Sequence, residues 1–283
     1  MKRTAWLLGA AALVLAILTA LTGGVFCGAT LHVPRRLGAA PPGAETVAIA
    51  ASDGARMSAW WMRPANWNGN CVTVLHGIGD SRVGSAGFAP LFLNEGYAVL
   101  LPDSRAHGAS EGRFVTYGLF EKYDTLSWAD WMRRAGCGKV YALGESLGAA
   151  VLIQAAAVRP VFSAVVAECA FADLRETAEY RARFAAGPAA KFVVGSGMLY
   201  ARFADGLDFT LVSPLRSIAL ARTPILLIHG LADSRTPPSN SERLAEANKS
   251  DPLWLVPNAL HTGAAAAAPA EFRSRVLAWF AGH

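Results

Sequence analysis

The sequence predicts a mostly parallel α/β sheet with an N-terminal antiparallel hairpin, flanking helices and a small helical lid, preceded by an N-terminal transmembrane helix. Three observations lead to this fold class. The chain opens with a stretch, Thr4 to Leu31, that carries no charged residue. Two alternating segments then meet at a Ser-Asp-Gly turn. Six short apolar runs follow, separated by helix-like segments, which is the order of a parallel sheet covered on both faces.

Four parts follow from this order along the 283 residues. We expect a membrane anchor or signal segment over residues 1–33 and a linker that contains Pro and Gly over 34–44. One α/β domain covers 45–283, a length that buries a full core, with a lid insertion at about 169–222.

The N-terminal stretch is longer than the roughly 20 apolar residues that cross a bilayer as a helix. A cleaved signal peptide is the alternative, but its apolar part is usually about 7 to 15 residues and ends at a small-x-small site. The candidate sites, Ala20-Leu21-Thr22 and Cys27-Gly28-Ala29, fit that pattern poorly. The prediction is therefore an uncleaved, single-pass membrane anchor. Both alternatives imply export, so we expect the domain that follows to be extracytoplasmic.

The net charge of +5 and the isoelectric point near 9.2 raise the question of a nucleic-acid partner. The arginines are scattered singly, without a basic helix face and without interleaved aromatic residues. This pattern is typical of a solvated surface, so no nucleic-acid partner is predicted. The partner expected of the N-terminal segment is membrane lipid, with attraction to anionic lipid as a milder consequence of the charge.

Two of the four cysteines, Cys71 and Cys137, each lie at the upstream end of an apolar run. If those runs are neighbouring parallel strands, the two thiols lie at the same end of the sheet. We therefore hypothesise a Cys71–Cys137 disulfide, with two buried free thiols as the alternative. No Cys-x-x-Cys or His-Glu-x-x-His spacing occurs, so no metal site is predicted.

The individual elements follow from hydrophobic periodicity. Segments Glu45–Ala51 and Ala55–Arg63 alternate apolar with small or polar residues around Ser52-Asp53-Gly54, which predicts a hairpin. Continuous apolar runs predict buried parallel strands. These runs are Val72–Leu75, Ala98–Leu101, Val140–Leu143, Ala164–Ala167, Ile225–Ile228 and Leu253–Val256. Helices are predicted over Leu119–Arg134, Leu147–Val158, Ser239–Ala247 and Ala270–Ala281.

One connection is too long for a simple crossover. More than fifty residues separate Ala167 from Ile225, and they are rich in Ala, Arg, Phe and Tyr. Breaks occur at Gly187-Pro188 and Ser213-Pro214. We interpret this segment as a small helical lid over the carboxyl edge of the sheet.

A candidate nucleophile lies in the pentapeptide Gly144-Glu145-Ser146-Leu147-Gly148, directly after a predicted strand. In a strand–turn–helix of this kind the backbone bends too tightly at the serine to leave room for side chains on either side, which explains the two glycines. The pentapeptide alone is a weak signal, because Gly-x-Ser-x-Gly arises by chance in roughly one such sequence in seven.

Loops after the last two predicted strands supply the partners that a serine nucleophile needs. Asp233 follows one strand and His261 follows the other, so both side chains can converge on Ser146. His261 is then the base, and Asp233 fixes the tautomer of its imidazole and stabilises the cation. Glu168, which ends the strand after the serine helix, is the alternative acid.

The loop after the first core strand, His76-Gly77-Ile78-Gly79-Asp80, contains glycines that let it pass close to the serine. We expect the backbone N–H groups of Ile78 and Leu147 to form an oxyanion hole. His76 itself is interpreted as a brace for its own loop.

The loop after the second core strand begins at Asp103 and also carries Arg105 and His107. An acid and two basic groups in one turn predict an internally paired loop that shapes the wall of the site. His107 is the runner-up base, although it precedes the serine in the chain.

These residues resemble the α/β-hydrolase superfamily, and within it the membrane-anchored, serine-aminopeptidase-like hydrolases. The matching motifs are His76-Gly77-Ile78-Gly79, Asp103-x-Arg105-x-His107-Gly108-x-Ser110, Tyr117-Gly118-x-x-Glu121-x-x-Asp124, Gly144-x-Ser146-x-Gly148, Glu168-Cys169-Ala170-Phe171, His229-Gly230-x-x-Asp233 and His261. They span roughly residues 45 to 280. The resemblance implies the fold and the Ser-Asp-His triad, but not the substrate. Two departures are Ala106, where related loops often have glycine, and Cys169-Ala170, where serine-proline is frequent.

The leading hypothesis for function is a serine hydrolase that cleaves an ester, thioester or amide through an acyl-enzyme and needs no cofactor. Its substrate would be a small-molecule ester or a peptide-like compound. One alternative is an acyltransferase on the same fold, which the sequence does not separate from a hydrolase. Another is a catalytically silent, membrane-tethered binding module, against which the intact set of nucleophile, base and acid argues.

Overall fold

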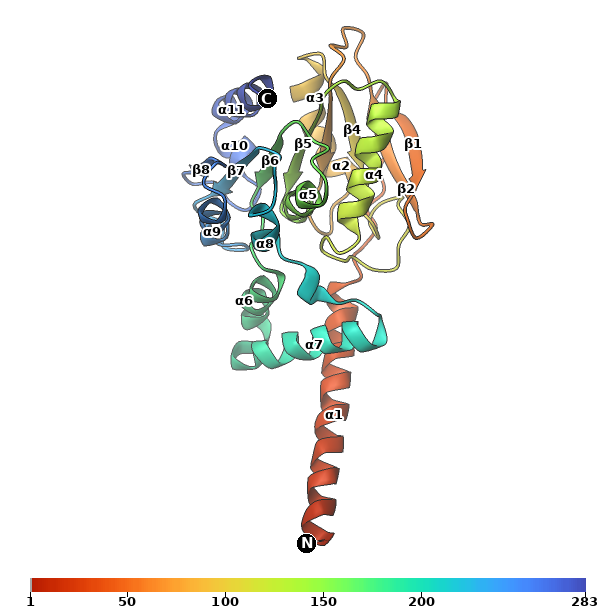
Figure 1. Ribbon diagram of the computed structural model, residues 1–283, viewed down its shortest axis with the longest axis vertical. Helices are drawn as coiled ribbons and strands as arrows, with labels where there is room; N and C mark the ends of the chain where they lie inside the picture. Colours follow the sequence, from red (N-terminus) through yellow and green to blue (C-terminus); the bar gives the residue numbers. More distant parts are fainter. Residues whose placement is uncertain (1) are drawn as a thin grey trace. The chain divides into compact units, whose positions relative to one another are not determined.

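The computed structural model describes residues 2–283, so Met1 of the predicted anchor lies outside the described residues. The chain divides into two compact units (Figure 1). The helical unit consists of the N-terminal segment up to His32 and of Leu174–Leu211. The sheet unit consists of Val33–Asp173 and Val212–His283. The segments predicted as anchor and as lid insertion therefore both contribute to the helical unit.

The sheet unit is built on one eight-stranded sheet in the order β1-β2-β4-β3-β5-β6-β7-β8. The strands are β1 (Glu45–Ala50), β2 (Arg56–Met62), β3 (Cys71–Leu75), β4 (Ala98–Pro102), β5 (Val140–Glu145), β6 (Val165–Glu168), β7 (Ile225–Gly230) and β8 (Leu253–Val256). β2 pairs antiparallel with β1 and β4, and all pairs from β4 to β8 in the sheet are parallel. The predicted mostly parallel α/β class is confirmed, with its hairpin and all six further strands. The last of them, β8, lies at the edge of the sheet and alternates partly buried with buried residues, so the prediction that it is buried on both faces is wrong.

Helices flank this sheet. They are α2 (Arg82–Ser85), α3 (Ala89–Leu93), α4 (Glu121–Arg134), α5 (Leu147–Val158), α8 (Pro214–Ile218), α9 (Ser239–Ala247), α10 (Ala264–Ala267) and α11 (Pro269–Ala281). Pro214 occupies the first turn of α8, and the Ser213 hydroxyl accepts a hydrogen bond from Arg216 N (3.3 Å). The predicted break at this Ser-Pro pair is therefore the start of a helix. Tyr141 of β5 stacks on Phe280 of α11 in the core, with ring centroids 4.7 Å apart.

Both ends of the inserted segment meet at one place in the sheet unit. Leu215 N donates a hydrogen bond to Ala172 O (2.9 Å), and Ala172 N donates to Asn240 Oδ1 (3.0 Å). The chain therefore leaves the sheet unit after β6 and returns to it before β7 beside the same residue.

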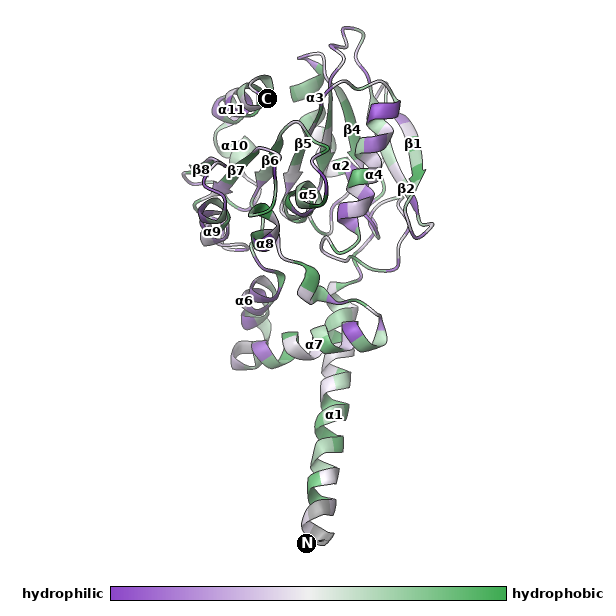
Figure 2. Ribbon diagram, in the orientation of Figure 1, coloured by the Kyte–Doolittle hydropathy of each residue, from purple (hydrophilic) through white to green (hydrophobic). Residues whose placement is uncertain are grey.

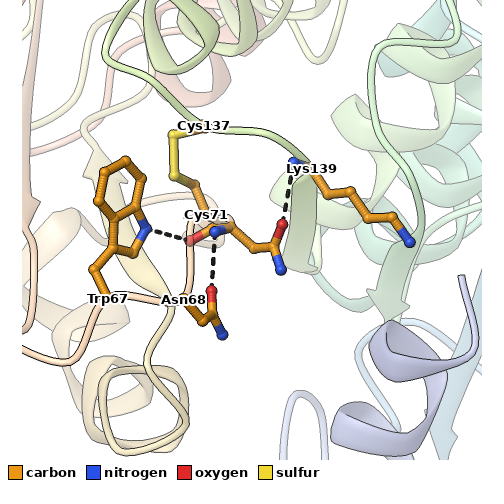
Figure 3. The surroundings of a disulfide bond; sticks show 6 residues. Trp67, Asn68, Cys71, Cys137 and Lys139 are labelled. Carbon is orange, nitrogen blue, oxygen red and sulfur yellow. Dashed lines mark hydrogen bonds between the residues drawn. A yellow bond between two sulfur atoms is a disulfide. The ribbon is translucent and has the colours of Figure 1, made fainter.

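The amino edge of the sheet carries a disulfide between Cys71 and Cys137 (Figure 3). Cys71 begins β3 and pairs in register with Val140 of β5, which places the two cysteines near each other. Their Cα atoms lie 5.7 Å apart. Asn70, next to the bridge, accepts hydrogen bonds at Oδ1 from Lys139 N (3.2 Å) and at its backbone oxygen from Trp67 Nε1 (2.9 Å). The hypothesised disulfide is confirmed.

The helical unit contains α1 (Lys2–Thr30), α6 (Leu174–Ala186) and α7 (Ala190–Ala204). α1 is apolar along most of its length (Figure 2), and its segment Trp6–Thr30 is long and apolar enough to cross a membrane. α7 packs against the C-terminal part of α1 through small residues. A side chain at Gly23 would collide with the backbone of Ser196, and one at Gly197 would collide with Phe26. Glycines therefore allow the close approach of these two helices.

Candidate active site

Ser146 lies in the turn between β5 and α5. Its φ of 52° and ψ of −110° form a backbone conformation that L-residues rarely adopt. The turn is held by a hydrogen bond from Ser146 N to Glu168 O (2.8 Å). A Cβ at Gly144 would lie 2.6 Å from Ala149 N, and a Cβ at Gly148 would overlap the backbone oxygen of Leu75. Both glycines are therefore required by close packing, as the pentapeptide predicts.

A chain of hydrogen bonds joins Ser146, His261 and Asp233. His261 Nε2 lies 2.9 Å from Ser146 Oγ, and His261 Nδ1 lies 2.6 Å from Asp233 Oδ2. Asp233 Oδ2 can only accept when the carboxyl is ionised, so Nδ1 carries the proton and Nε2 is free to accept from the serine hydroxyl. The structure thus brings together the three side chains that the sequence selected, in the order that a triad requires.

Two backbone groups in its own turn orient Asp233. Its Oδ1 accepts hydrogen bonds from Arg235 N (2.8 Å) and Thr236 N (2.9 Å), which leaves Oδ2 directed at the imidazole. Burial opposes ionisation, but hydrogen bonds from His229 and His261 outweigh it and hold the pKa of Asp233 well below its usual range. Asp233 is therefore a carboxylate across the physiological pH range.

His229 also contributes to the site, although its residue pattern alone indicated no role for it. Its Nε2 lies 2.7 Å from Thr236 O and 3.2 Å from Asp233 Oδ2, while its Nδ1 lies 2.6 Å from Ser241 Oγ. Two acceptors face Nε2, so Nε2 carries the proton and Nδ1 accepts from the Ser241 hydroxyl. His229 therefore donates to the same oxygen that binds His261. The His-Gly-x-x-Asp spacing was the signal that could have pointed to this contact.

The proposed oxyanion donors lie on the two loops nearest the serine. A Cβ built on Gly77 would lie 3.4 Å from Ser146 Cβ, so the loop after β3 passes directly beside the nucleophile. Ile78 follows in that loop, and Leu147 is the first residue of α5. Neither backbone N–H donates a hydrogen bond to another group among residues 2–283. Both donors are thus available to a ligand, as expected at a helix N-terminus for Leu147.

The other two histidines near the site are engaged with backbone groups. His76 Nε2 accepts from Ser104 N (3.0 Å), and His107 Nε2 accepts from Gly79 N (3.1 Å). Burial lowers the pKa of His107 to about 4, so it stays neutral. His76 Nδ1 also lies 2.7 Å from Gly77 O, so His76 braces its own loop, as predicted, and joins it to the loop after β4. His107, the runner-up base, has its accepting nitrogen occupied by a peptide N–H and contacts the loop that carries Ile78 instead of the serine.

The loop after β4 is paired internally by hydrogen bonds, as predicted. Asp103 Oδ2 accepts from Ala109 N (2.8 Å), and His107 Nδ1 lies 2.8 Å from Arg105 O.

The ion pairs of this loop reach other segments, which the sequence did not predict. Asp103 forms an ion pair with Arg82 (3.3 Å), and Arg105 forms ion pairs with Asp53 (2.6 Å) and Asp124 (2.8 Å). These partners are distant in the sequence, so the loop also ties together the hairpin turn, α2 and α4.

Two carboxyl groups lie side by side at the carboxyl ends of β5 and β6, where Glu145 and Glu168 pair in register. Glu168 Oε1 accepts a hydrogen bond from Ala264 N (2.9 Å), so the acid in contact with His261 is Asp233 and not Glu168. Burial raises the pKa of Glu168 to about 7. Burial, with the nearby Glu168 and Asp80, raises the pKa of Glu145 to about 8.

One group of potential metal ligands is found among the described residues: Cys169, His229 and Asp233 have ligand atoms within 4.8 Å of one another. The Nε2–H of His229 is a donor here, and Cys169 Sγ accepts from Thr262 N (3.3 Å). Burial raises the pKa of the Cys169 thiol above its usual range. His229 and Cys169 therefore keep their protons, which metal binding would have to remove. The arrangement favours a contact from His229 to Asp233 over a metal site.

Comparison with known proteins supports the α/β-hydrolase fold. A family model of the alpha/beta hydrolase fold matches residues 70–192. The Bacillus subtilis protein YqkD, described as uncharacterized, is 29% identical over 197 residues, which covers 68% of this chain and 65% of that protein. The match therefore spans slightly less than two thirds of that relative. The Escherichia coli protein YfhR, also described as uncharacterized, is 28% identical over 236 residues, or 79% and 75% of the two chains.

Solved structures extend the likeness over most of the chain. The Pyrococcus furiosus esterase Pf2001 has a TM-score of 0.72 at 26% identity, covering 87% of this chain and 96% of that one. A hydrolase from Pseudomonas aeruginosa has a TM-score of 0.64 at 22% identity, covering 83% and 98%, and shows the same fold. The serine-aminopeptidase-like branch stays a prediction. The family model, which covers less than half of the chain, and the fold shared with the esterase support the α/β-hydrolase superfamily and an enzyme of the hydrolase class.

Proposed function

We propose that the protein is a serine hydrolase that cleaves a carboxylic ester through an acyl-enzyme, with Ser146 as nucleophile, His261 as base and Asp233 as the acid that orients it. The observation that carries the proposal is the unbroken hydrogen-bond chain from the Ser146 hydroxyl through the imidazole to Asp233. The likeness to an esterase supports the ester as substrate. Thioesters and amides react by the same steps.

In the first half of the reaction, Ser146 Oγ attacks the substrate carbonyl carbon while His261 Nε2 takes the hydroxyl proton. The tetrahedral intermediate collapses, its bond to the leaving oxygen breaks, and the imidazolium returns the proton to that oxygen. Water then attacks the acyl-enzyme, giving its proton to Nε2, and the acid is released as Ser146 regains its proton. Asp233 stays ionised throughout and stabilises the imidazolium.

The negative charge that develops on the carbonyl oxygen is stabilised by the N–H groups of Ile78 and Leu147. Gly79, the residue after Ile78, donates its N–H to His107 Nε2 (3.1 Å), which holds the first donor's loop in place. Leu147 is held as the first residue of α5. Fixed donors of this kind each lower the activation free energy by about 3 to 4 kcal/mol.

The enzyme is proposed to be membrane-anchored through α1, with the catalytic unit extracytoplasmic. The length and apolar character of Trp6–Thr30 support the anchor. The Cys71–Cys137 disulfide supports an oxidising location for the sheet unit.

Labelling by a fluorophosphonate probe tests the nucleophile. The wild-type protein should be labelled, and Ser146→Ala should not, because only an activated serine attacks the phosphorus. Ser250→Ala, which removes an exposed serine from a turn, is the matched control and should label like the wild type.

Hydrolysis of p-nitrophenyl esters measured in parallel distinguishes the alternatives. Equal labelling of the wild type and Ser146→Ala would refute the nucleophile. A wild type that neither labels nor hydrolyses would favour the catalytically silent binding module. Labelling with turnover only when an alcohol or amine acceptor is added would favour the acyltransferase.

A further inference from the structure

α7 carries two sets of small or apolar residues on different faces. One set is buried inside the helical unit: Ala190, Val194, Gly197 and Ala201. The other set follows a spacing of seven and then four residues and is exposed: Phe192, Leu199 and Phe203. Phe203, with 80% of its surface exposed, is the most exposed large apolar side chain among the described residues. Such a face needs a partner that is absent from the isolated chain.

The position of α7 along α1 indicates what that partner is. α7 lies across α1 (Figure 1), and the close contacts include Gly23 and Cys27, whose Sγ lies 3.2 Å from Gly197 O. Before Gly23, the uncharged residues Thr4 to Thr22 provide about 28 Å of helix. That length is close to the roughly 30 Å hydrocarbon thickness of a bilayer, so α7 lies near the level where a membrane spanned by α1 would end.

A cavity shows which side of α7 carries the exposed face. Its volume is about 440 Å³, and its lining includes Phe192 and Leu199 of α7 together with Thr19 of α1. Thr19 precedes Gly23 by one helical turn, toward the N-terminus. Phe192 and Leu199 therefore face the part of α1 that is proposed to lie in the membrane, and Phe203 follows Leu199 by four residues, about one turn, along α7.

The same cavity is lined by cationic side chains. Arg175 forms an ion pair with Glu179 (3.0 Å), and Arg202 lies 3.7 Å from Asp208. Lys191, the third cation of the lining, has no ion-pair partner among residues 2–283. An ammonium group without an ion-pair partner beside aromatic and aliphatic side chains suits a lipid, whose phosphate adjoins its acyl chains.

We infer that Phe192, Leu199, Phe203 and Lys191 form an interfacial face that binds the headgroup layer of a phospholipid bilayer. The three apolar side chains reach the acyl chains, and Lys191 binds lipid phosphate. This inference rests on the proposed anchor role of α1. It adds that the segment inserted between β6 and β7 is itself a membrane-binding element, whose helix α7 lies in the plane of the membrane surface.

Spin labels on the full-length protein in phosphatidylcholine–phosphatidylglycerol vesicles test the depth of this face. A label is placed at Phe203→Cys, with Leu13→Cys in α1 as the hydrocarbon reference and Lys249→Cys, in an exposed turn of the sheet unit, as the aqueous reference. The chain without an introduced cysteine sets the background from the buried Cys27 and Cys169. Accessibility to oxygen and to a water-soluble nickel chelate is measured at each position.

The label at Phe203 should be more accessible to oxygen than to nickel, with a depth between the two references. If the Leu13 label reports hydrocarbon while the Phe203 label behaves like that at Lys249, the interfacial face is refuted and the anchor stands. If the Leu13 label is itself aqueous, the anchor proposal fails, and the inference fails with it.

The role of Lys191 has a separate test in detergent. Adding phosphatidylglycerol to the wild type should raise the thermal midpoint, because a ligand of the folded state stabilises it. Lys191→Gln should lose at least about half of that increase, and Lys249→Gln should keep it. An equal increase in Lys191→Gln and the wild type, or none in the wild type, would refute phosphate binding at this cavity.

Discussion

The carboxyl and amino edges of the sheet differ in how their backbone is held. All six non-glycine residues with positive φ among residues 2–283 lie in loops that follow the carboxyl ends of β4, β5, β6 or β8. They are Ala106, Tyr117, Ser146, Cys169, Asn258 and Thr262. The amino edge has none of them. It is closed instead by the Cys71–Cys137 disulfide and by Asp251, whose Oδ1 accepts from Ile225 N (3.0 Å) at the start of β7.

This difference shows how one sheet serves two requirements. Each strained residue lowers the free energy of unfolding by about 1–3 kcal/mol. Six of them at one edge are tolerated because contacts elsewhere in the sheet unit provide enough stability to offset this cost. At the carboxyl edge, the strained backbone orients side chains such as that of Ser146. The amino edge contributes stability and contacts no candidate catalytic side chain. Substitution of a catalytic side chain at the carboxyl edge should therefore lower kcat, whereas loss of a contact at the amino edge should lower the free energy of unfolding without changing kcat.

The largest expected effect is on the rate, from the carboxyl edge. Asp233→Asn should lower kcat by about 10³- to 10⁴-fold, because the amide no longer holds His261 in the tautomer that accepts from Ser146. Asp251→Asn, the matched change at the amino edge, should leave kcat within about twofold, because its amide oxygen still accepts from Ile225 N. Steady-state ester hydrolysis measures both, and similar losses in the two variants would contradict the separation.

The next effect is on stability, from the amino edge. The double variant Cys71→Ala/Cys137→Ala should lower the free energy of unfolding by about 4 kcal/mol, because the bridge closes a loop across 66 residues. Its kcat should match the wild type at a temperature where both are folded. Denaturant unfolding and ester hydrolysis provide the two measurements. A loss of activity without loss of stability would show that the bridge supports the catalytic edge.

A pH-dependent effect is expected from Glu145. Its pKa is about 8 in the folded state, so the folded chain holds a proton that the unfolded chain releases near the usual glutamate pKa of 4.5. Stability from this group is full below about pH 4.5 and is lost as the pH rises toward 8, by at most about 1.4 kcal/mol per pH unit. Glu145→Gln should remove this loss, and the exposed control Glu246→Gln should keep it. Denaturant unfolding at pH 5 and pH 8 measures the free energy of unfolding of each variant. Between these pH values, Glu145→Gln should lose less of it than the wild type.

The smallest effect concerns one strained residue. Ala106 has a φ of 61°, which explains why related loops often carry glycine there. Ala106→Gly should raise the free energy of unfolding by up to about 1 kcal/mol. Ala109→Gly, in the same loop without positive φ, should lower it. If both variants lose stability equally, strain at Ala106 is negligible.

The sequence was sufficient to predict the strands, the longer helices of the sheet unit and the three central side chains. Strands such as β3 and β7 are buried on both faces and therefore read as unbroken apolar runs. Ser146, Asp233 and His261 each follow such a run, so knowing where the strands end was enough to bring them together. The pairing of Cys71 with Cys137 followed from the same reasoning about strand starts.

What the sequence did not predict depends on contacts between distant segments. Arg105 pairs with Asp53 of the hairpin turn, and no local pattern indicates that partner. The hydrogen bond from His229 to Asp233 depends on the turn between them and on Ser241 fixing the tautomer. Short helices such as α2 and α10, each of four residues, are too short to show a period.

The hydrogen bond from Leu215 to Ala172 has a consequence for how this enzyme can change. Because the inserted segment departs and returns at one pinned point, its length and sequence can vary without altering the register of β6 and β7. On the proposal that α7 binds the membrane surface, exchange of this segment between homologous enzymes would change that surface contact while α1 still anchored the chain.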